Sequence, residues 1–135
     1  IKRAIESKNS LVVWGDGSTI RDFIHAKDVS RGMVFAMEKG VHEPVNLGSG
    51  NGVSIRELVE VIVSCLDKKL EIVWDTSKPS GDKKRLMDMS RMVGHGFETI
   101  VSLEDGIRDT IQWYKREKGG VNKSYNVFAE GIKFN

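Results

Sequence analysis

The stretch Val12-Val13-Trp14-Gly15-Asp16-Gly17-Ser18-Thr19-Ile20-Arg21-Asp22-Phe23-Ile24-His25-Ala26-Lys27-Asp28 places several polar and charged residues between two short apolar runs. Residues 12–14 predict a short strand, and the Gly-Asp-Gly-Ser that follows is typical of a turn because glycine takes positive φ without steric cost. Beyond the turn, alternation in an extended segment places Arg21, Phe23 and His25 on one side. The stretch therefore predicts a strand, a turn and a second extended segment.

Trp14 and Arg21 stand on either side of this turn and suit one kind of ligand. An aromatic ring stacks on a flat base, and a guanidinium group forks around phosphate oxygens. The alternative is a hairpin that carries a buried tryptophan and a solvated arginine. Short motifs are weak signals, so the local pattern alone leaves both interpretations open.

Composition places the chain among globular proteins of one domain. It has 135 residues, of which 39% are hydrophobic and 30% charged, enough for a core and unlike a disordered tail. The net charge of +2 gives no electrostatic indication of a nucleic acid or an anionic membrane. No apolar run approaches the ~20 residues that span a bilayer, and the first residues lack the apolar core of a signal peptide. We therefore expect a cytoplasmic protein.

Two single features add to this description. The lone Cys65 lies in an apolar run, where a small buried hydrophobic residue is expected, and it allows no disulfide within one chain. The chain begins at Ile1, without a methionine and in the middle of an amphipathic pattern. We therefore expect that a longer polypeptide precedes it.

Hydrophobic periodicity predicts an α/β fold, with a small α+β-like domain in which a short mixed sheet packs with about four helices. Met33, Val34 and Met37 have helical spacing, and we assign them to the core. Helices are expected at 1–8, before Gly40, at 54–67 and from Ser102 to Gly119, with a helical turn at 89–93. Strands are expected at 12–14, 44–48 and 70–74, and extended segments at 21–25 and 86–88.

Two loops are candidates for binding an anion. The glycine-rich loop 48–52 runs into a helix with Ser54 as N-cap and Glu57 three residues on, which is the capping-box pattern. Helix N-termini bind phosphate, but this loop lacks the dinucleotide-binding spacing and the P-loop lysine, so a structural turn is favoured. The loop 75–85 carries four cations, and it either binds an anion or is a solvated lysine run.

Four landmarks, taken in order, resemble the C-terminal part of the extended short-chain dehydrogenase/reductase family, the NAD(P)-dependent epimerases and dehydratases that act on nucleotide sugars. They are Val13-Trp14-Gly15-Asp16-Gly17 with Arg21 to Asp28, Val45 to Gly50 with Ser54 to Leu58, Lys78 through Asp88, and Ser102 to Ile107 ending in Trp113-Tyr114. The resemblance covers residues 1–119, a nucleotide-sugar substrate-binding domain, and leaves 120–135 as a tail of unknown packing. Residues 77–88 look most like the GDP-L-fucose synthases.

The resemblance implies six substrate-binding residues and no catalytic, cofactor or metal residue in this chain. Trp14 and Arg21 match positions that contact the sugar and the diphosphate, and Arg85 matches a basic residue near the diphosphate. Lys78 lies at the mouth of the same loop, and Asn46 and Ser49 lie on a turn near the substrate cleft. The pattern His-x-x-Asp at positions 25–28 looks structural.

The chain departs from the family pattern in three places. The glycine-rich cofactor fingerprint and the catalytic Tyr-x-x-x-Lys both lie upstream of the matching part in the family. Tyr114 and Lys118 fit that spacing, but at the end of a terminal helix, and we assign the match to chance. Glu71 stands where fucose synthases tend to carry a basic residue.

The resemblance implies the substrate-binding portion of a nucleotide-sugar epimerase, dehydratase or reductase, inactive without the cofactor-binding Rossmann half. Such a chain would bind no cofactor alone, while the whole enzyme would use NADP or NAD. We expect a nucleotide-diphosphate sugar as ligand, with GDP favoured, a homo-oligomer, and neither nucleic acid nor membrane as partner. The alternative is a free-standing nucleotide-sugar-binding or assembly module without catalysis.

Overall fold

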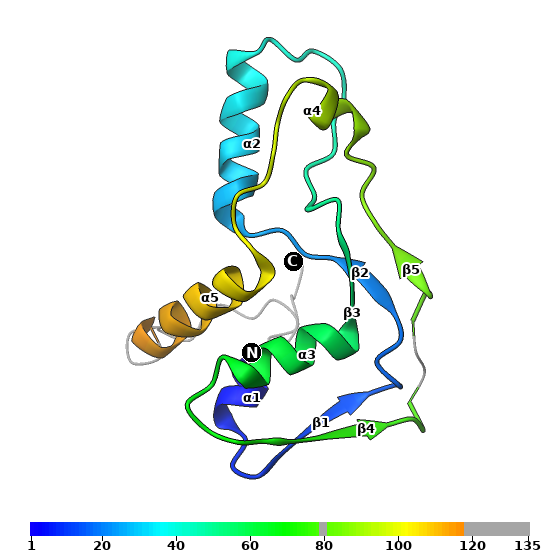
Figure 1. The fold of residues 1–135 in the computed structure, drawn as a ribbon, viewed down its shortest axis with the longest axis vertical. Coiled ribbons are helices and arrows are strands. Elements are labelled where there is room, and N and C mark those ends of the chain that lie inside the picture. The colour runs from blue at the N-terminus through cyan, green and yellow to red at the C-terminus, as the bar shows by residue number, and fades with distance from the viewer. Residues whose placement is uncertain (79–80, 118–135) are drawn as a thin grey trace, which may run out of the picture.

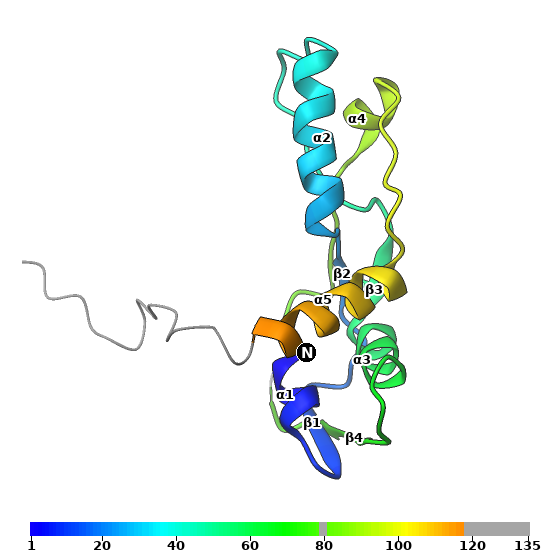
Figure 2. The ribbon, with the colours of Figure 1, turned by 90° about the vertical axis from the view of Figure 1, so that its left-hand side faces the viewer.

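The computed structural model describes residues 1–78 and 81–117, and within them the chain forms an α/β arrangement. The elements run in the order α1 (Lys2–Glu6), β1 (Ser10–Trp14), β2 (Ile20–Asp22), α2 (Ala26–Glu38), β3 (Gly52–Ser54), α3 (Ile55–Ser64), β4 (Glu71–Asp75), β5 (Lys84–Arg85), α4 (Ser90–Gly94) and α5 (Leu103–Glu117). The molecule is elongated, with α2 and α4 at one end and α1, β1 and β4 at the other (Figures 1 and 2). Among the described residues, no helix has the length and apolar character to cross a membrane.

The strands of the described residues form two small sheets, where the sequence predicted one. β1 and β4 pair in parallel, from Ser10 opposite Glu71 to Trp14 opposite Asp75. β2 is the middle strand of the second sheet, antiparallel to β3 and parallel to β5. The predicted mixed sheet is therefore confirmed only for β3, β2 and β5, because β1 and β4 pair separately.

The hairpin interpretation of the opening stretch is wrong. β1 and β2 lie in different sheets, and Trp14 is 64% exposed. The turn itself is confirmed, with Gly15 and Gly17 at positive φ (82° and 78°). It is bonded to two other elements, since the Gly15 N–H donates to the carbonyl of Asp75 and the Arg56 N–H donates to the carbonyl of Gly17, both at 2.9 Å. These bonds, rather than a hairpin ladder, hold the turn.

The larger hydrophobic core lies among α1, β1, α3, β4 and α5. Ile62 of α3 and Ile107 and Ile111 of α5 are buried in this core. Cys65 is only half-buried at the end of α3, where the sequence predicted burial. The buried residues of this core are Ala4, Leu11, Val59, Ile62, Leu70, Ile107 and Ile111.

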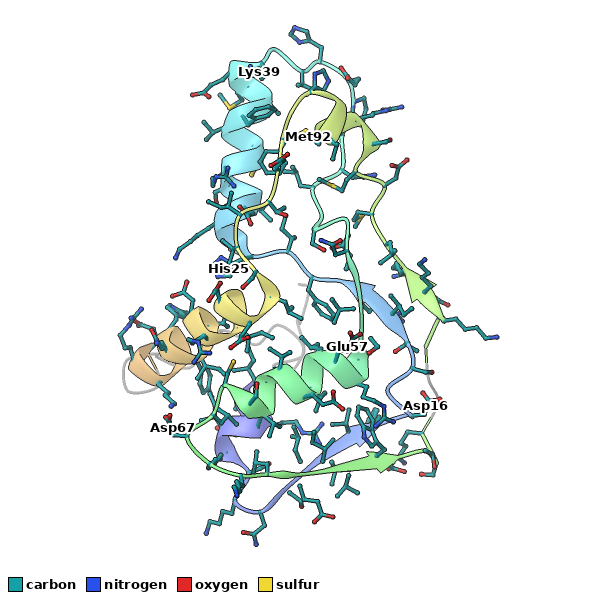
Figure 3. The ribbon with its side chains drawn as sticks, in the orientation of Figure 1. Asp16, His25, Lys39, Glu57, Asp67 and Met92 are labelled. Atoms are coloured by element: carbon teal, nitrogen blue, oxygen red, sulfur yellow. The ribbon has the colours of Figure 1, made fainter. Side chains whose placement is uncertain are left out.

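A second core holds α2 against α4 and the segment after it. Met89, Met92 and Phe97 are buried there, and Met92 lies between α2 and α4 (Figure 3). The ring centroids of Phe35 and Phe97 are 5.5 Å apart. The backbone of α2 lies very close to the side chain of Leu47, since a Cβ at Gly32 would lie 2.4 Å from one of its methyl carbons.

The assignment of three α2 residues to the core is wrong for the described part of the chain. Met33, Val34 and Met37 are 60%, 53% and 82% exposed. The inner side of α2 carries Phe35 and Ala36 instead. The helical spacing correctly marked one face, but no described segment covers it.

Residues 44–48, predicted as a strand, form none in the described structure. The segment pairs with no strand among the described residues, and side chains hold it instead. Arg91 Nη1 donates to the carbonyl of Pro44 (2.6 Å), and the Gly48 N–H donates to the sulfur of Met89 (2.9 Å).

Side-chain caps fix where three helices begin. The Ser54–Glu57 capping box of α3 is confirmed in both directions, and Ser102 Oγ accepts the Asp105 N–H (3.1 Å) at the start of α5. His25 caps α2, because its Nδ1 accepts the Lys27 N–H at 3.3 Å. These caps satisfy N–H groups that the first turn of a helix leaves without a backbone partner.

Asp28 joins the start of α2 to the segment that leads into α5. It is fully buried, and its carboxylate accepts the N–H groups of Ile100 and Val101 at 2.9–3.2 Å and pairs with Arg31 at 2.5 Å. Burial alone would raise the pKa of Asp28, but these hydrogen bonds and the Arg31 charge outweigh it and lower the pKa below its ordinary value.

The Asp28→Asn variant should lose about 2–3 kcal/mol of unfolding free energy, because two buried amides lose a charged acceptor. Since the folded pKa is lowered, the carboxylate stabilises the fold above the unfolded pKa of ~3.9, and this contribution disappears as pH falls through the folded pKa. Urea unfolding at pH 7 and below pH 4 measures both effects. Glu38→Gln, which removes an exposed carboxylate of the same helix, is the control, and equal behaviour of the two variants would contradict the prediction.

Candidate functional site

Arg21 and Arg85 lie opposite each other on the paired strands β2 and β5. Arg21 Nη1 donates to the carbonyl oxygens of Asp82 (2.7 Å) and Ile20 (2.8 Å). Arg85 Nη2 donates to the carboxylate of the same Asp82 at 3.1 Å. Two guanidinium groups therefore meet around one acidic residue, and an anionic ligand would compete with its oxygens for their donors.

A small cavity of about 140 Å³ opens beside these two arginines. The turn that contains Leu47 and Gly48 forms its far wall. The cavity therefore lies between β2 and β5 on one side and the start of the glycine-rich loop on the other. The lining residues are Arg21, Asp22, Ile24, Leu47, Gly48, Arg85, Leu86 and Met87.

Asp22 organises the walls of this cavity, and the sequence reasoning did not single it out. Its carboxylate accepts the N–H and Oγ–H of Ser49 (2.7 and 2.6 Å) and the N–H of Met87 (3.3 Å). Burial opposes ionisation, but these bonds outweigh it and lower the pKa of Asp22 below its ordinary value. The sequence held one signal for Asp22: in the alternating extended segment it lies on the other side from Arg21 and Phe23.

The glycine-rich loop 48–52 is a structural turn, as the sequence favoured. The N–H groups of Gly48 and Ser49 are already taken by Met89 and Asp22. A Cβ at Gly48 would lie 2.6 Å from an oxygen of Asp22, so glycine is needed for close approach rather than for a phosphate. The donor set of this loop does not fit a dinucleotide.

Asn46 and Ser49 flank the cavity but use their side chains internally. Asn46 Nδ2 donates to the carbonyl of Asp88 at 3.0 Å, and Ser49 Oγ donates to Asp22. Neither residue lines the cavity, although Leu47 and Gly48, which lie between them in the sequence, do.

Trp14 and Lys78 lie at the other end of the loop 75–85 and do not line the cavity. Trp14 is opposite Asp75 in the β1–β4 pair, and the Lys78 N–H donates to the carbonyl of Asp75 at 3.3 Å. Both side chains are exposed. Of the six predicted residues, only Arg21 and Arg85 line the cavity, while Trp14 and Lys78 lie beside Asp75 at the start of this loop, whose residues 79–80 lie outside the described structure.

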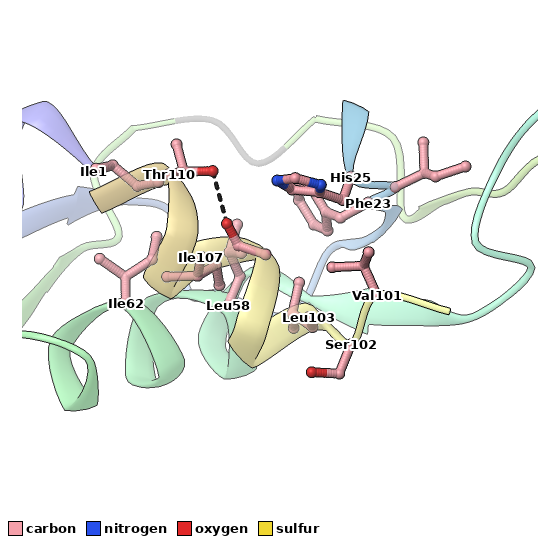
Figure 4. Close-up of a pocket in the computed structure, with 12 residues that line it drawn as sticks. Ile1, Phe23, His25, Leu58, Ile62, Val101, Ser102, Leu103, Ile107 and Thr110 are labelled. Carbon is pink, nitrogen blue, oxygen red and sulfur yellow. Dashed lines mark hydrogen bonds between the residues drawn. The ribbon is translucent and has the colours of Figure 1, made fainter. Parts of the chain in front are cut away.

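A larger cavity, of about 310 Å³, lies between α3, α5 and the segment 23–25 (Figure 4). Leu58, Ile62 and Ile107 give it an apolar wall, and it has no arginine or lysine. His25 lies at its edge, with Nε2 3.5 Å from Asp109, and acts as the cap of α2. The structural role predicted for His25 is confirmed, and the cavity lacks the charge that a diphosphate requires.

The remaining candidate groups in the described residues do not form a reaction centre. Tyr114 Oη lies 3.4 Å from Glu6 on α1, while Lys118 lies outside the described residues. No cluster of His, Cys, Asp or Glu in the described part of the chain could hold a metal ion.

Residues 1–48 match the model of the NAD dependent epimerase/dehydratase family. The first 48 residues are therefore similar to members of this family. They contain Trp14, Arg21 and Asn46, three of the six predicted substrate-binding residues.

GDP-L-fucose synthase 1 of Arabidopsis thaliana is 38% identical over 112 residues, which cover 82% of this chain and 34% of that protein. Two solved structures are each 31% identical and cover 81% of this chain and 36% of theirs. One is GDP-mannoheptose C4 reductase from Campylobacter jejuni with NADP bound (TM-score 0.69), and the other is UDP-glucose 4-epimerase from Thermotoga maritima with UDP-glucose (TM-score 0.68). The chain thus spans about a third of the length of the relatives it matches.

Proposed function

We propose that this chain is the substrate-binding part of an NAD(P)-dependent nucleotide-sugar epimerase or reductase similar to GDP-L-fucose synthase. The observation that carries the proposal is the pairing of Arg21 and Arg85 on adjacent strands beside a cavity. Two guanidinium forks at one place match the oxygens of a diphosphate. The relatives with names that include GDP-sugars and UDP-sugars support this class of ligand.

In this proposal the chain binds and orients the substrate. Arg21 and Arg85 hold the diphosphate, the exposed Trp14 ring offers a stacking face, and Asp22 keeps the cavity wall in place. The nicotinamide cofactor, when bound by the rest of the enzyme, supplies the hydride chemistry. Binding energy gained at the diphosphate, away from the reacting atoms, holds the sugar in place for reaction. The chain supplies this positioning only, so alone it turns over no substrate.

Arg21→Ala should weaken binding of GDP about tenfold or more, because a charge-assisted contact to phosphate is lost. Calorimetric titration of the chain with GDP, UDP, their hexose conjugates and free hexose measures this, and we expect GDP and GDP-sugar to bind better than free sugar. Arg108→Ala, which removes an exposed arginine of α5 paired with Glu104, is the control.

Equal affinity of the Arg21→Ala variant and the wild type would remove Arg21 from the site. Absence of any nucleotide binding by the wild type would favour the assembly-module alternative. Because Arg21 also binds two backbone carbonyls, thermal unfolding of the variant must show a folded chain before its affinity is interpreted.

Asp82→Asn should tighten GDP binding about twofold to fivefold, the size expected when a competing exposed ion pair is removed. Its carboxylate occupies Arg85 Nη2 in the structure, while its carbonyl, which binds Arg21, stays in the variant. The same titration measures the effect, with Asp67→Asn as an exposed acidic control near α5. Weaker binding by Asp82→Asn would mean that Asp82 supports the site rather than competing with the ligand.

The exposed apolar face of α2 supports a second part of the proposal. Met33, Val34 and Met37 form this face, and the backbone segment 44–48 at the same end has no strand partner among the described residues. We assign this end to contact with the cofactor-binding part of the enzyme. A chain without that part would cover the face by self-association.

Light scattering of the purified chain should therefore show a homodimer or a larger oligomer. The double variant Met33→Glu, Met37→Lys should shift it toward monomer, since two charges would face the interface. Glu60→Lys, at an exposed position of α3 away from this face, should leave the mass unchanged. A monodisperse wild-type monomer would count against this part of the proposal.

A further inference from the structure

The turn between β1 and β2 separates two proposed ligand residues, Trp14 and Arg21, so its conformation sets how they are placed. Asp16, at the middle of the turn, lies where β1 ends and close to the start of α3 (Figure 3). Its carboxylate accepts the N–H and Oγ–H of Ser18 at 2.9 and 2.7 Å, which closes the turn on itself. A backbone bond from Ile55 to Thr19 (2.9 Å) attaches the end of the turn to α3.

Arg56 makes two contacts with this turn and a third with Trp74 of β4. Its Nη2 donates to the carbonyl of Asp16 at 2.7 Å, and its backbone N–H donates to the carbonyl of Gly17 at 2.9 Å. Its guanidinium carbon lies 4.6 Å from the centre of the Trp74 ring, within the range of a cation–π contact. Nη2 and one face of this guanidinium are thus directed to the protein.

Trp74 closes the other side of the turn. A Cβ at Gly17 would lie 2.6 Å from the Trp74 ring and 3.1 Å from Cβ of Arg56, so the turn is seated against both side chains. Gly17 also has φ of 78°, which disfavours any side chain. The turn is therefore held between a strand of one sheet and the first turn of α3.

We propose that Arg56 is a positioning residue, which stacks on Trp74 and binds Asp16 to hold the turn so that Trp14 and Arg21 meet one nucleotide diphosphate together. This inference rests on the proposed function for the identity of the ligand. It adds a residue that touches no ligand and acts through Trp74 and the turn. Its place at the second residue of α3 couples the helix to the ligand residues.

The test is a double-mutant cycle of Arg56→Ala and Trp74→Leu, read by calorimetric titration with GDP. Arg56→Ala should weaken binding about tenfold, through loss of one cation–π contact and one hydrogen bond that hold the turn. Because both residues act on the same turn, the double variant should bind GDP about as weakly as the single variant that has the lower affinity. Additive losses would mean that Arg56 and Trp74 act independently rather than through one turn, which would overturn the inference.

Amide hydrogen exchange supplies a readout that does not depend on the ligand. Arg56→Ala should speed exchange of the Gly15 and Ser18 amides and leave the amides of the second half of α3 unchanged. Unchanged exchange in the turn would overturn the inference even if binding fell. Failure of the wild type to bind any nucleotide would overturn the proposed function, and with it the ligand named here, while the exchange result still decides how the turn is held.

Gly17→Ala and Gly40→Ala give a matched pair. Both glycines have positive φ, but a Cβ at Gly17 meets the Trp74 ring, whereas one at Gly40 meets only His42 at 3.9 Å. Gly17→Ala should weaken GDP binding about as much as Arg56→Ala, and Gly40→Ala should not. Equal affinities of the two alanine variants would contradict the positioning role of the turn.

Discussion

One buried carboxylate, Asp28, ties the two halves of the described molecule together. The larger core lies around α3 and α5, and the second core lies around α2 and α4. Asp28 stands at the start of α2 and binds the two amides that precede α5 by a few residues. Because a buried charge is stable only when fully paired, the segment 100–101 cannot move away from α2 without a large cost. This junction links the start of α2, beside the second core, to the segment that leads into α5 of the larger core.

Local features of the chain were predicted correctly from the sequence, whereas the pairing between distant segments was not. The capping box of Ser54 and Glu57 follows from spacing within one helix, so it was predicted. The exposure of Met37 and the missing strand at 44–48 depend on what lies beside them, and a single sequence does not state that. The same limit led to one predicted sheet in place of two.

The candidate site shows the same division. Arg21 was chosen from its place beyond the turn and Arg85 from a family resemblance, and the structure brings them to opposite positions on paired strands. Asp22 was missed because its importance comes from Ser49 and Met87, which lie far from it in the sequence. Choosing the small cationic cavity over the larger apolar one follows from charge, since a diphosphate needs donors more than volume.

The parallel pairing of β1 with β4 has a consequence for how the chain folds. The two strands are separated by about sixty residues of sequence, and β2 likewise pairs with β5 from a distant segment. Closing such loops costs entropy before any contact compensates for it, whereas α2, α3 and α5 form from near neighbours. The helices are therefore expected to form early and the strand pairs late. The arginine pair at β2 and β5 would then be among the last features to assemble, so a nucleotide could bind only a chain that has completed its folding.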